Sequence, residues 1–168
     1  YLMKNPMIDV LKPKSEKETK NVRALTVEEQ QEFTAYLMSK NVEKCKYKNV
    51  FLLQMYCGLR IGETLALRDT DIDLQRNLLS VTKTITTDKD GKAIMGDSTK
   101  TYAGIREIPI PEYIRDCLME QMEIAKENRD RQLFLSSNGR YIDGRNANRI
   151  LKKRLKEIGK KGVLALIV

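Results

Sequence analysis

Histidine is absent from this sequence of 168 residues. The chain therefore lacks the commonest general base of enzymes and the commonest metal-binding side chain. No apolar run approaches the length of about 18 residues that a transmembrane helix needs, so we expect no membrane partner. The N-terminus also has no apolar segment of the kind that marks a signal peptide.

Cysteine is scarce, with residues only at positions 45, 57 and 117 and no Cys-x-x-Cys spacing. An odd number without that spacing indicates neither a disulfide framework nor a zinc site, and we expect reduced thiols in or near the core of a cytoplasmic protein. The sequence also has no P-loop, no glycine-rich dinucleotide turn and no acidic metal cluster. We therefore expect no cofactor, neither a small molecule nor a metal.

Positive charge is in excess, with a formal net charge of +8 and a pI near 9.4. Hydrophobic residues make up 41% and charged residues 32%, a balance typical of soluble globular domains. The length suits one domain with a proper core. A basic domain of this kind favours a polyanion such as nucleic acid as its partner. The charge alone suits an unrelated basic enzyme equally well.

Residues 1–24 resemble an interdomain linker, because they are charged, interrupted by proline and poor in aromatic residues. The chain begins at Tyr1 without a start methionine, and we expect that another segment precedes it. Residues 25–168 are expected to form the folded domain.

Helix signals recur along the chain. Thr26 and Glu29 have the spacing of a capping box, which predicts a helix start at Thr26. Residues 46–57 are apolar on nearly all sides, which predicts a buried helix. Further helices are expected over 61–67, 111–129 and 143–158, the last capped by Asp143 and rich in lysine and arginine.

Strand signals lie between these helices. Residues 78–85 are β-branched and partly alternating, 93–95 form a weaker candidate, and 106–110 form a last short one. We therefore predict an α+β fold that is mainly α-helical, with a small three-stranded antiparallel sheet inserted among the helices. The apolar end, 163–168, either stays uncovered or folds back onto exposed apolar surface.

One arginine stands out where the second helix ends. Gly58 ends that helix, because glycine tolerates the left-handed conformation of a helix terminus. Arg60 follows, between the apolar residues Leu59 and Ile61, so we expect its guanidinium to lie beside the core and to need a partner. Glu63 is the nearest candidate. The local sequence allows either a structural ion pair or a cation directed at an anion.

Two further basic features lie downstream. Thr-Lys-Thr at residues 99–101 sits in a loop of small residues between two expected strands, and taken alone Lys100 is an ordinary turn lysine. Arg106 suits a contact with backbone phosphate or with solvent equally well. Arg145 and Arg149 lie on the basic last helix, which is often only a solvated face.

Taken together, these motifs resemble the catalytic domain of the tyrosine recombinases, the phage integrase family, and most of all integrases of bacterial mobile elements. The resemblance runs from about residue 22 to about 158. The matching motifs are Leu-Thr-x-Glu-Glu at 25–29, Gly-Leu-Arg-x-x-Glu at 58–63, Leu-x-x-x-Asp-Ile-Asp at 67–73 and Thr-Lys-Thr-x-Ala-Gly-x-Arg-x-Ile-Pro-Ile at 99–110. The resemblance implies a fold like that of the DNA breaking-rejoining enzymes. It also implies site-specific DNA integration and excision through a 3′-phosphotyrosyl intermediate, without metal or cofactor.

The resemblance also implies roles for single residues. Arg60 matches the first catalytic arginine, whose fork binds two phosphate oxygens. Lys100 matches the lysine that donates a proton to the leaving 5′-oxygen, and Glu63 matches a supporting glutamate. Contacts with double-stranded DNA are expected from Thr101, Arg106, Arg145 and Arg149. Family members assemble as tetramers on DNA.

This sequence departs from the family pattern after the last basic helix. The family continues with a His-x-x-Arg box, a later histidine or tryptophan and the nucleophilic tyrosine, and none of these boxes is present here. Tyr102 is a poor candidate nucleophile because it precedes the boxes that it would need. Residues 25–168 therefore resemble a partial catalytic domain that we expect to be inactive alone. The alternative is a non-catalytic DNA-binding or partner-binding remnant of such a recombinase.

Overall fold

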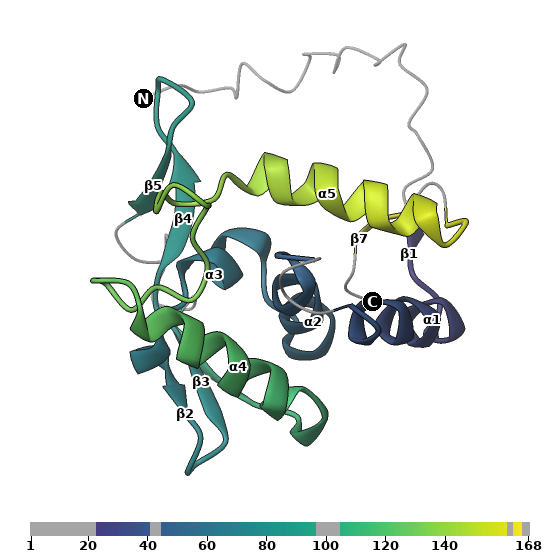
Figure 1. Ribbon diagram of the computed structural model, residues 1–168, viewed down its shortest axis with the longest axis horizontal. Coiled ribbons are helices and arrows are strands. Elements are labelled where there is room, and N and C mark those ends of the chain that lie inside the picture. Colours follow the sequence, from purple (N-terminus) through teal and green to yellow (C-terminus); the bar gives the residue numbers. More distant parts are fainter. Residues whose placement is uncertain (1–22, 41–44, 97–104, 161–162, 166–168) are drawn as a thin grey trace, which may run out of the picture.

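The computed structural model describes residues 23–40, 45–96, 105–160 and 163–165 (Figure 1). Helices α2 (Lys48–Cys57) and α3 (Ile61–Ala66) lie in the middle of the molecule. Helix α1 (Val27–Met38) packs against α2, and α5 (Gly144–Glu157) packs against α3. Helix α4 (Arg115–Lys126) covers α2 from another side and follows the short 3-10 helix η3 (Glu112–Ile114).

The helix signals of the sequence are confirmed. The capping box of α1 is present, because the Glu29 backbone N–H donates to Thr26 Oγ1 at 3.3 Å and the Thr26 N–H donates to Glu29 Oε2 at 3.1 Å. Helix α2 is buried on nearly every side. Gly58 follows it with φ of 62°, in the left-handed region. Asp143 caps α5 by accepting a hydrogen bond from the Arg145 backbone N–H at 2.8 Å.

The fold class is confirmed, but the strands pair differently from the prediction. Strands β2 (Ile72–Asp73), β3 (Leu78–Val81) and β6 (Arg106–Pro109) form a three-stranded antiparallel sheet in the order β2-β3-β6. Strands β4 (Thr84–Thr87) and β5 (Ala93–Gly96) form a separate antiparallel hairpin. The single strand predicted over 78–85 was therefore wrong. Strand β3 pairs with β2 at Leu78 and Leu79 and with β6 along its whole length, whereas the residues from Thr84 onward form β4 and pair with β5 instead.

The two ends of the described chain meet. Strand β7 (Val163–Ala165) pairs in parallel with β1 (Arg23–Ala24), with Arg23 opposite Val163. The start of the apolar end therefore folds back onto the chain. Residues 1–22 of the expected linker and 166–168 of the apolar end lie outside the described residues, and the boundary at residue 24 stays a prediction.

The core joins all the larger elements. Its largest fully buried side chains come from α1, α2, α3, β3, η3, α4, α5 and the segments between them. They include Phe33, Leu37, Phe51, Leu52, Leu59, Leu79, Ile114, Leu118, Leu133 and Leu155. Cys45, Cys57 and Cys117 are free and buried, as expected for reduced core thiols. No helix within the described ranges has the length and apolar character needed to cross a bilayer.

Candidate functional site

Arg60 stands between two helices, at the point where the buried α2 ends and α3 begins. Leu59 is fully buried and anchors the connection, while Arg60 has an extended backbone and serves as the N-cap of α3. The Arg60 side chain is 77% exposed. The expectation that its guanidinium lies beside the core was therefore wrong, because Leu59 takes the buried place and the turn into α3 directs Arg60 outward. Its expected partner, Glu63, is confirmed.

Glu63 is the buried anion at the centre of the site, with a side chain only 3% exposed. Its Oε1 accepts hydrogen bonds from Arg60 Nη1 at 2.9 Å and from Arg106 Nη1 at 3.1 Å. Its Oε2 accepts from the Arg60 backbone N–H at 2.9 Å and from Arg106 Nη2 at 2.8 Å. The carboxylate therefore holds the backbone and side chain of Arg60 together with the fork of Arg106.

Two opposing effects set the ionisation of Glu63. Burial favours the neutral carboxyl, but the hydrogen bonds from Arg106 and Arg60 and the positive charge of Arg106 outweigh it, so the pKa of Glu63 falls below its usual value. The hydrogen bond to Glu63 raises the pKa of Arg106. Among the described residues, these three side chains, two guanidinium groups and one carboxylate, carry a net charge of +1. The outer member of the three is the exposed Arg60.

Helix α3 is pressed against the β4–β5 hairpin at Gly62. A Cβ atom at this position would lie 2.5 Å from Thr84 Oγ1 and 2.7 Å from the carbonyl oxygen of Ile85. Atoms do not approach so closely, and only glycine allows this contact without movement. Sequence reasoning missed this role, although a glycine inside a short helix is a signal of close packing.

Lys100 and Thr101 lie outside the described residues. Strand β5 ends at Gly96 and β6 begins at Arg106, so the described chain flanks them on both sides. The Arg106 side chain is 31% exposed, and its fork donates a hydrogen bond to each carboxylate oxygen of Glu63.

Helix α5 presents a basic face that borders the hairpin. Its buried residues are Ala147, Leu151 and Leu155, and most of its cations lie outside that apolar stripe. Arg145 pairs with Asp143 at 2.6 Å and donates to the backbone oxygen of Gly91, in the β4–β5 turn, at 3.0 Å. Arg149 donates to Asn146 Oδ1 at 2.8 Å. The structure therefore places Arg145 beside the hairpin that packs on α3.

Arg154 belongs to the packing between helices. Its Nη1 lies 3.1 Å from Glu157 Oε2 and 3.5 Å from the hydroxyl of Tyr36, which itself donates to Glu157. Tyr56 is similarly occupied, because its hydroxyl is 2.9 Å from Thr34 Oγ1. Both tyrosines therefore tie α1 to its neighbours, as packing residues do.

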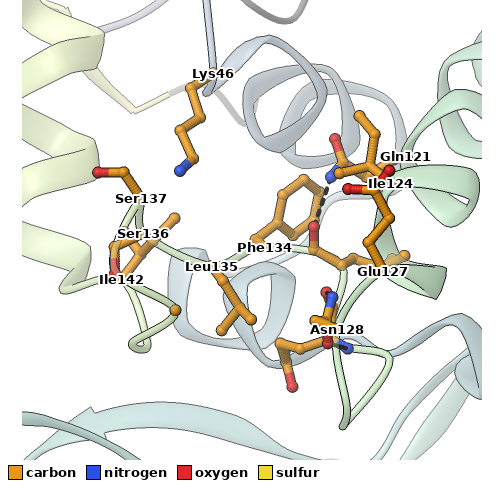
Figure 2. A pocket seen from close by; sticks show the side chains of 13 residues that line it. Lys46, Gln121, Ile124, Glu127, Asn128, Phe134, Leu135, Ser136, Ser137 and Ile142 are labelled. Atoms are coloured by element: carbon orange, nitrogen blue, oxygen red, sulfur yellow. Dashed lines mark hydrogen bonds between the residues drawn. The ribbon is translucent and has the colours of Figure 1, made fainter.

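A pocket of about 360 Å³ opens elsewhere, between α4 and the segment that precedes α5 (Figure 2). Lys46 reaches toward it from one side and Glu127 and Asn128 line the other. Neither Arg60 nor Glu63 nor Arg106 lines this pocket, so it is distinct from the site that these three residues form. Within the described part of the chain, no group of three or more acidic, cysteine or histidine side chains is placed to hold a metal ion.

Comparison with known proteins places this arrangement in a family. The sequence pattern of the phage integrase family matches residues 23–165. The prophage integrase IntR of Escherichia coli is 30% identical over 102 residues, which cover 61% of this chain and 23% of that protein. The tyrosine recombinase XerC of Alcanivorax borkumensis is 28% identical over 174 aligned positions, covering 95% of this chain and 49% of that protein.

Solved structures show the same fold. The Tn1549 transposon integrase in complex with transposon right end DNA superposes with a TM-score of 0.73 at 22% identity, over 98% of this chain and 55% of that chain. The XerA recombinase superposes with a TM-score of 0.63 at 17% identity, over 86% of this chain and 46% of that chain. The chain therefore spans about half the length, or less, of the relatives it matches.

Proposed function

Because this chain belongs to the phage integrase family, whose pattern matches residues 23–165, we propose that it is part of a site-specific DNA recombinase. The parent reaction is DNA integration and excision through a 3′-phosphotyrosyl intermediate. The relatives support this proposal, since they are named as an integrase and a tyrosine recombinase, and the Tn1549 integrase was solved with transposon DNA.

The observation that carries the proposal is the exposed guanidinium of Arg60 beside the buried carboxylate of Glu63. Only one Arg60 Nη group donates to Glu63, and the side chain is largely open to solvent. A planar guanidinium in this position is suited to bind two non-bridging oxygens of a DNA phosphate. Held in place before the reaction, it would stabilise the negative charge that grows on those oxygens in the transition state.

In this proposal Lys100 donates a proton to the leaving 5′-oxygen, as its match to the family lysine implies. Thr101, Arg145 and Arg149 contact the DNA backbone. Two observations support the backbone contacts: α5 carries most of its cations away from its buried stripe, and Arg145 borders the β4–β5 turn at Gly91.

We further propose that these 168 residues do not cleave DNA by themselves, because the sequence contains no histidine and therefore no His-x-x-Arg box. The test is a nicked suicide duplex carrying the attachment site of the parent element. It traps any covalent protein–DNA complex, which denaturing electrophoresis then detects. We expect no covalent band from this chain. A band from this chain that is lost after treatment with protease would contradict the proposal.

A second candidate function is a non-catalytic module that binds DNA or a partner protein. The basic outer face of α5 favours it. A module that contacts several phosphates binds DNA with an affinity that falls steeply as salt increases. Filter binding of a duplex of arbitrary sequence at about 50 mM and about 200 mM salt measures this salt dependence. Absence of binding at the lower salt concentration would rule out the DNA-binding module.

A further inference from the structure

Arg106 and Arg60 share one carboxylate, although they lie on different elements. Arg106 is the first residue of β6, and Arg60 precedes α3. Arg106 gives Glu63 two parallel hydrogen bonds, one to each carboxylate oxygen, at 3.1 and 2.8 Å. The Arg60 side chain gives Glu63 one, at 2.9 Å. The stronger, bidentate hold on the carboxylate therefore belongs to Arg106.

The charges of the three groups explain why it matters that Arg106, and not Arg60, makes the bidentate contact with Glu63. Arg60 and Glu63 alone would form a neutral pair, and a buried carboxylate beside Arg60 would oppose the approach of a phosphate. Arg106 adds the second positive charge and occupies both carboxylate oxygens. The Arg60 side chain is 77% exposed, so its remaining donors stay available to a phosphate. The three groups together keep a net charge of +1.

We propose that Arg106 is a positioning residue that neutralises and fixes Glu63, so that Arg60 keeps its charge and orientation for a DNA phosphate. The inference rests on the proposed function of Arg60. It differs from a direct contact between Arg106 and phosphate, in which Arg106 would act independently of Glu63. Removal of the Glu63 charge distinguishes the two roles, because only the positioning role depends on that charge.

The experiment is a double-mutant cycle on the folded chain, with Arg106→Gln, Glu63→Gln and the double variant. The probe is a fluorescein-labelled duplex of about 30 base pairs of arbitrary sequence, at low salt, read by fluorescence anisotropy. We expect R106Q alone to lower DNA affinity about tenfold, because it leaves Glu63 to neutralise Arg60. In the E63Q background the same substitution is expected to change the affinity less than about twofold, since no charge needs neutralising.

The comparison between E63Q and E63Q/R106Q decides the question even if R106Q alone fails to fold, because neither variant leaves a buried carboxylate unpaired. A loss in the E63Q background equal to that expected of R106Q would overturn the proposal and assign Arg106 a direct phosphate contact. No loss from a folded R106Q in the native background would overturn it as well. Thermal unfolding of each variant verifies the fold.

Arg76→Gln is the matched control, because Arg76 also pairs with a glutamate of β6, Glu107, at 3.5 Å but lies 62% exposed. The same change in net charge is made there without touching Glu63.

Failure of the proposed function and failure of this inference give different results. If the native chain does not bind the duplex at low salt, or if Arg60→Gln has no effect, the function proposed for Arg60 fails. If Arg60→Gln weakens binding but the cycle is additive, only the inference fails.

Discussion

At the scale of single residues, the site depends on where one negative charge is placed. Glu63 is buried and ionised, and it accepts hydrogen bonds from two guanidinium groups and a backbone N–H. A buried carboxylate with such partners stabilises the fold only while it keeps its charge. The sequence predicted the pair with Arg60 from the spacing of three residues. It could not show the pair with Arg106, which lies 43 positions away in the chain.

Removal of the Glu63 charge is expected to make stability depend less on pH. Glu63→Gln should lower the free energy of unfolding at pH 7 by about 1–3 kcal/mol. The folded-state pKa of Glu63 lies below its ordinary value of 4.5. Its ionised form therefore contributes stability above about pH 4.5, and this contribution is lost as pH falls through the folded-state pKa.

Urea unfolding of the native chain and the E63Q variant at a series of pH values measures this effect. We expect the two free energies of unfolding to differ at pH 7 and to converge in acid. Glu107→Gln is the control, because Glu107 lies next to Arg106 on β6 but is 52% exposed. It should change stability by less than about 1 kcal/mol. A difference between the native chain and E63Q that is equally large at pH 7 and pH 3 would contradict the account.

Cys57 precedes the glycine that ends α2, and its thiol is expected to be unreactive in the folded chain. Burial raises the pKa of Cys57 to about 11, from an ordinary value of 9.0. At pH 8 the thiolate fraction is therefore about a hundredfold smaller than in the unfolded chain. Alkylation with iodoacetamide, read by mass spectrometry, should be slower by at least that factor than in urea. Similar rates in the folded and unfolded chain would show that the end of α2 opens readily.

At the scale of elements, the site is built where α3 meets the β4–β5 hairpin. Gly62 allows the contact, with Thr84 and Ile85 directly against its backbone. Arg60 caps the same helix, and Glu63 lies within it. Any shift of α3 on the hairpin therefore moves the arginine and its carboxylate together.

Gly62→Ala is expected to destabilise the chain by about 1–3 kcal/mol, because a methyl group cannot fit 2.5 Å from Thr84 Oγ1. Alanine has the better helix propensity, so a stabilising result would mean that the close contact does not exist. Gly144→Ala is the matched control. Its Cβ would lie 3.5 Å from Ile61 Cγ2, an ordinary contact, and it should leave stability nearly unchanged. Thermal unfolding of both variants makes the comparison.

The elements themselves were largely predictable, because helix periodicity, caps and the terminating glycine are local signals. The Thr26–Glu29 box, Gly58 and Asp143 each act within a few residues of their own position. Strand pairing was not predictable in the same way. Residues 78–85 have the β-branched composition of one strand, but their partners, β2, β6 and β5, are chosen by packing across the fold. The contact between Arg106 and Glu63 was missed for the same reason.

At the scale of the whole molecule, the positive charge is unevenly shared among the described helices, because α5 is strongly basic whereas α1 and α4 carry more acidic than basic residues. The +8 net charge agrees with a polyanionic partner. Much of it lies on α5, whose apolar stripe packs inward against the core while Arg145 and Arg149 lie on its exposed part. Arg60 is one cation among many, so its own contribution to DNA binding has to be measured separately from that of the net charge.

The most direct measurement is the salt dependence of DNA binding by the native chain and by Arg60→Gln. Each affinity for a labelled duplex is measured by fluorescence anisotropy over a series of salt concentrations. The account predicts weaker binding by R60Q, with the slope of log affinity against log salt reduced by about one unit, as the loss of one phosphate contact requires. Arg76→Gln, the paired control, should keep a steeper slope than R60Q. Identical affinity and slope for the native chain and R60Q would contradict the central claim that Arg60 binds a DNA phosphate.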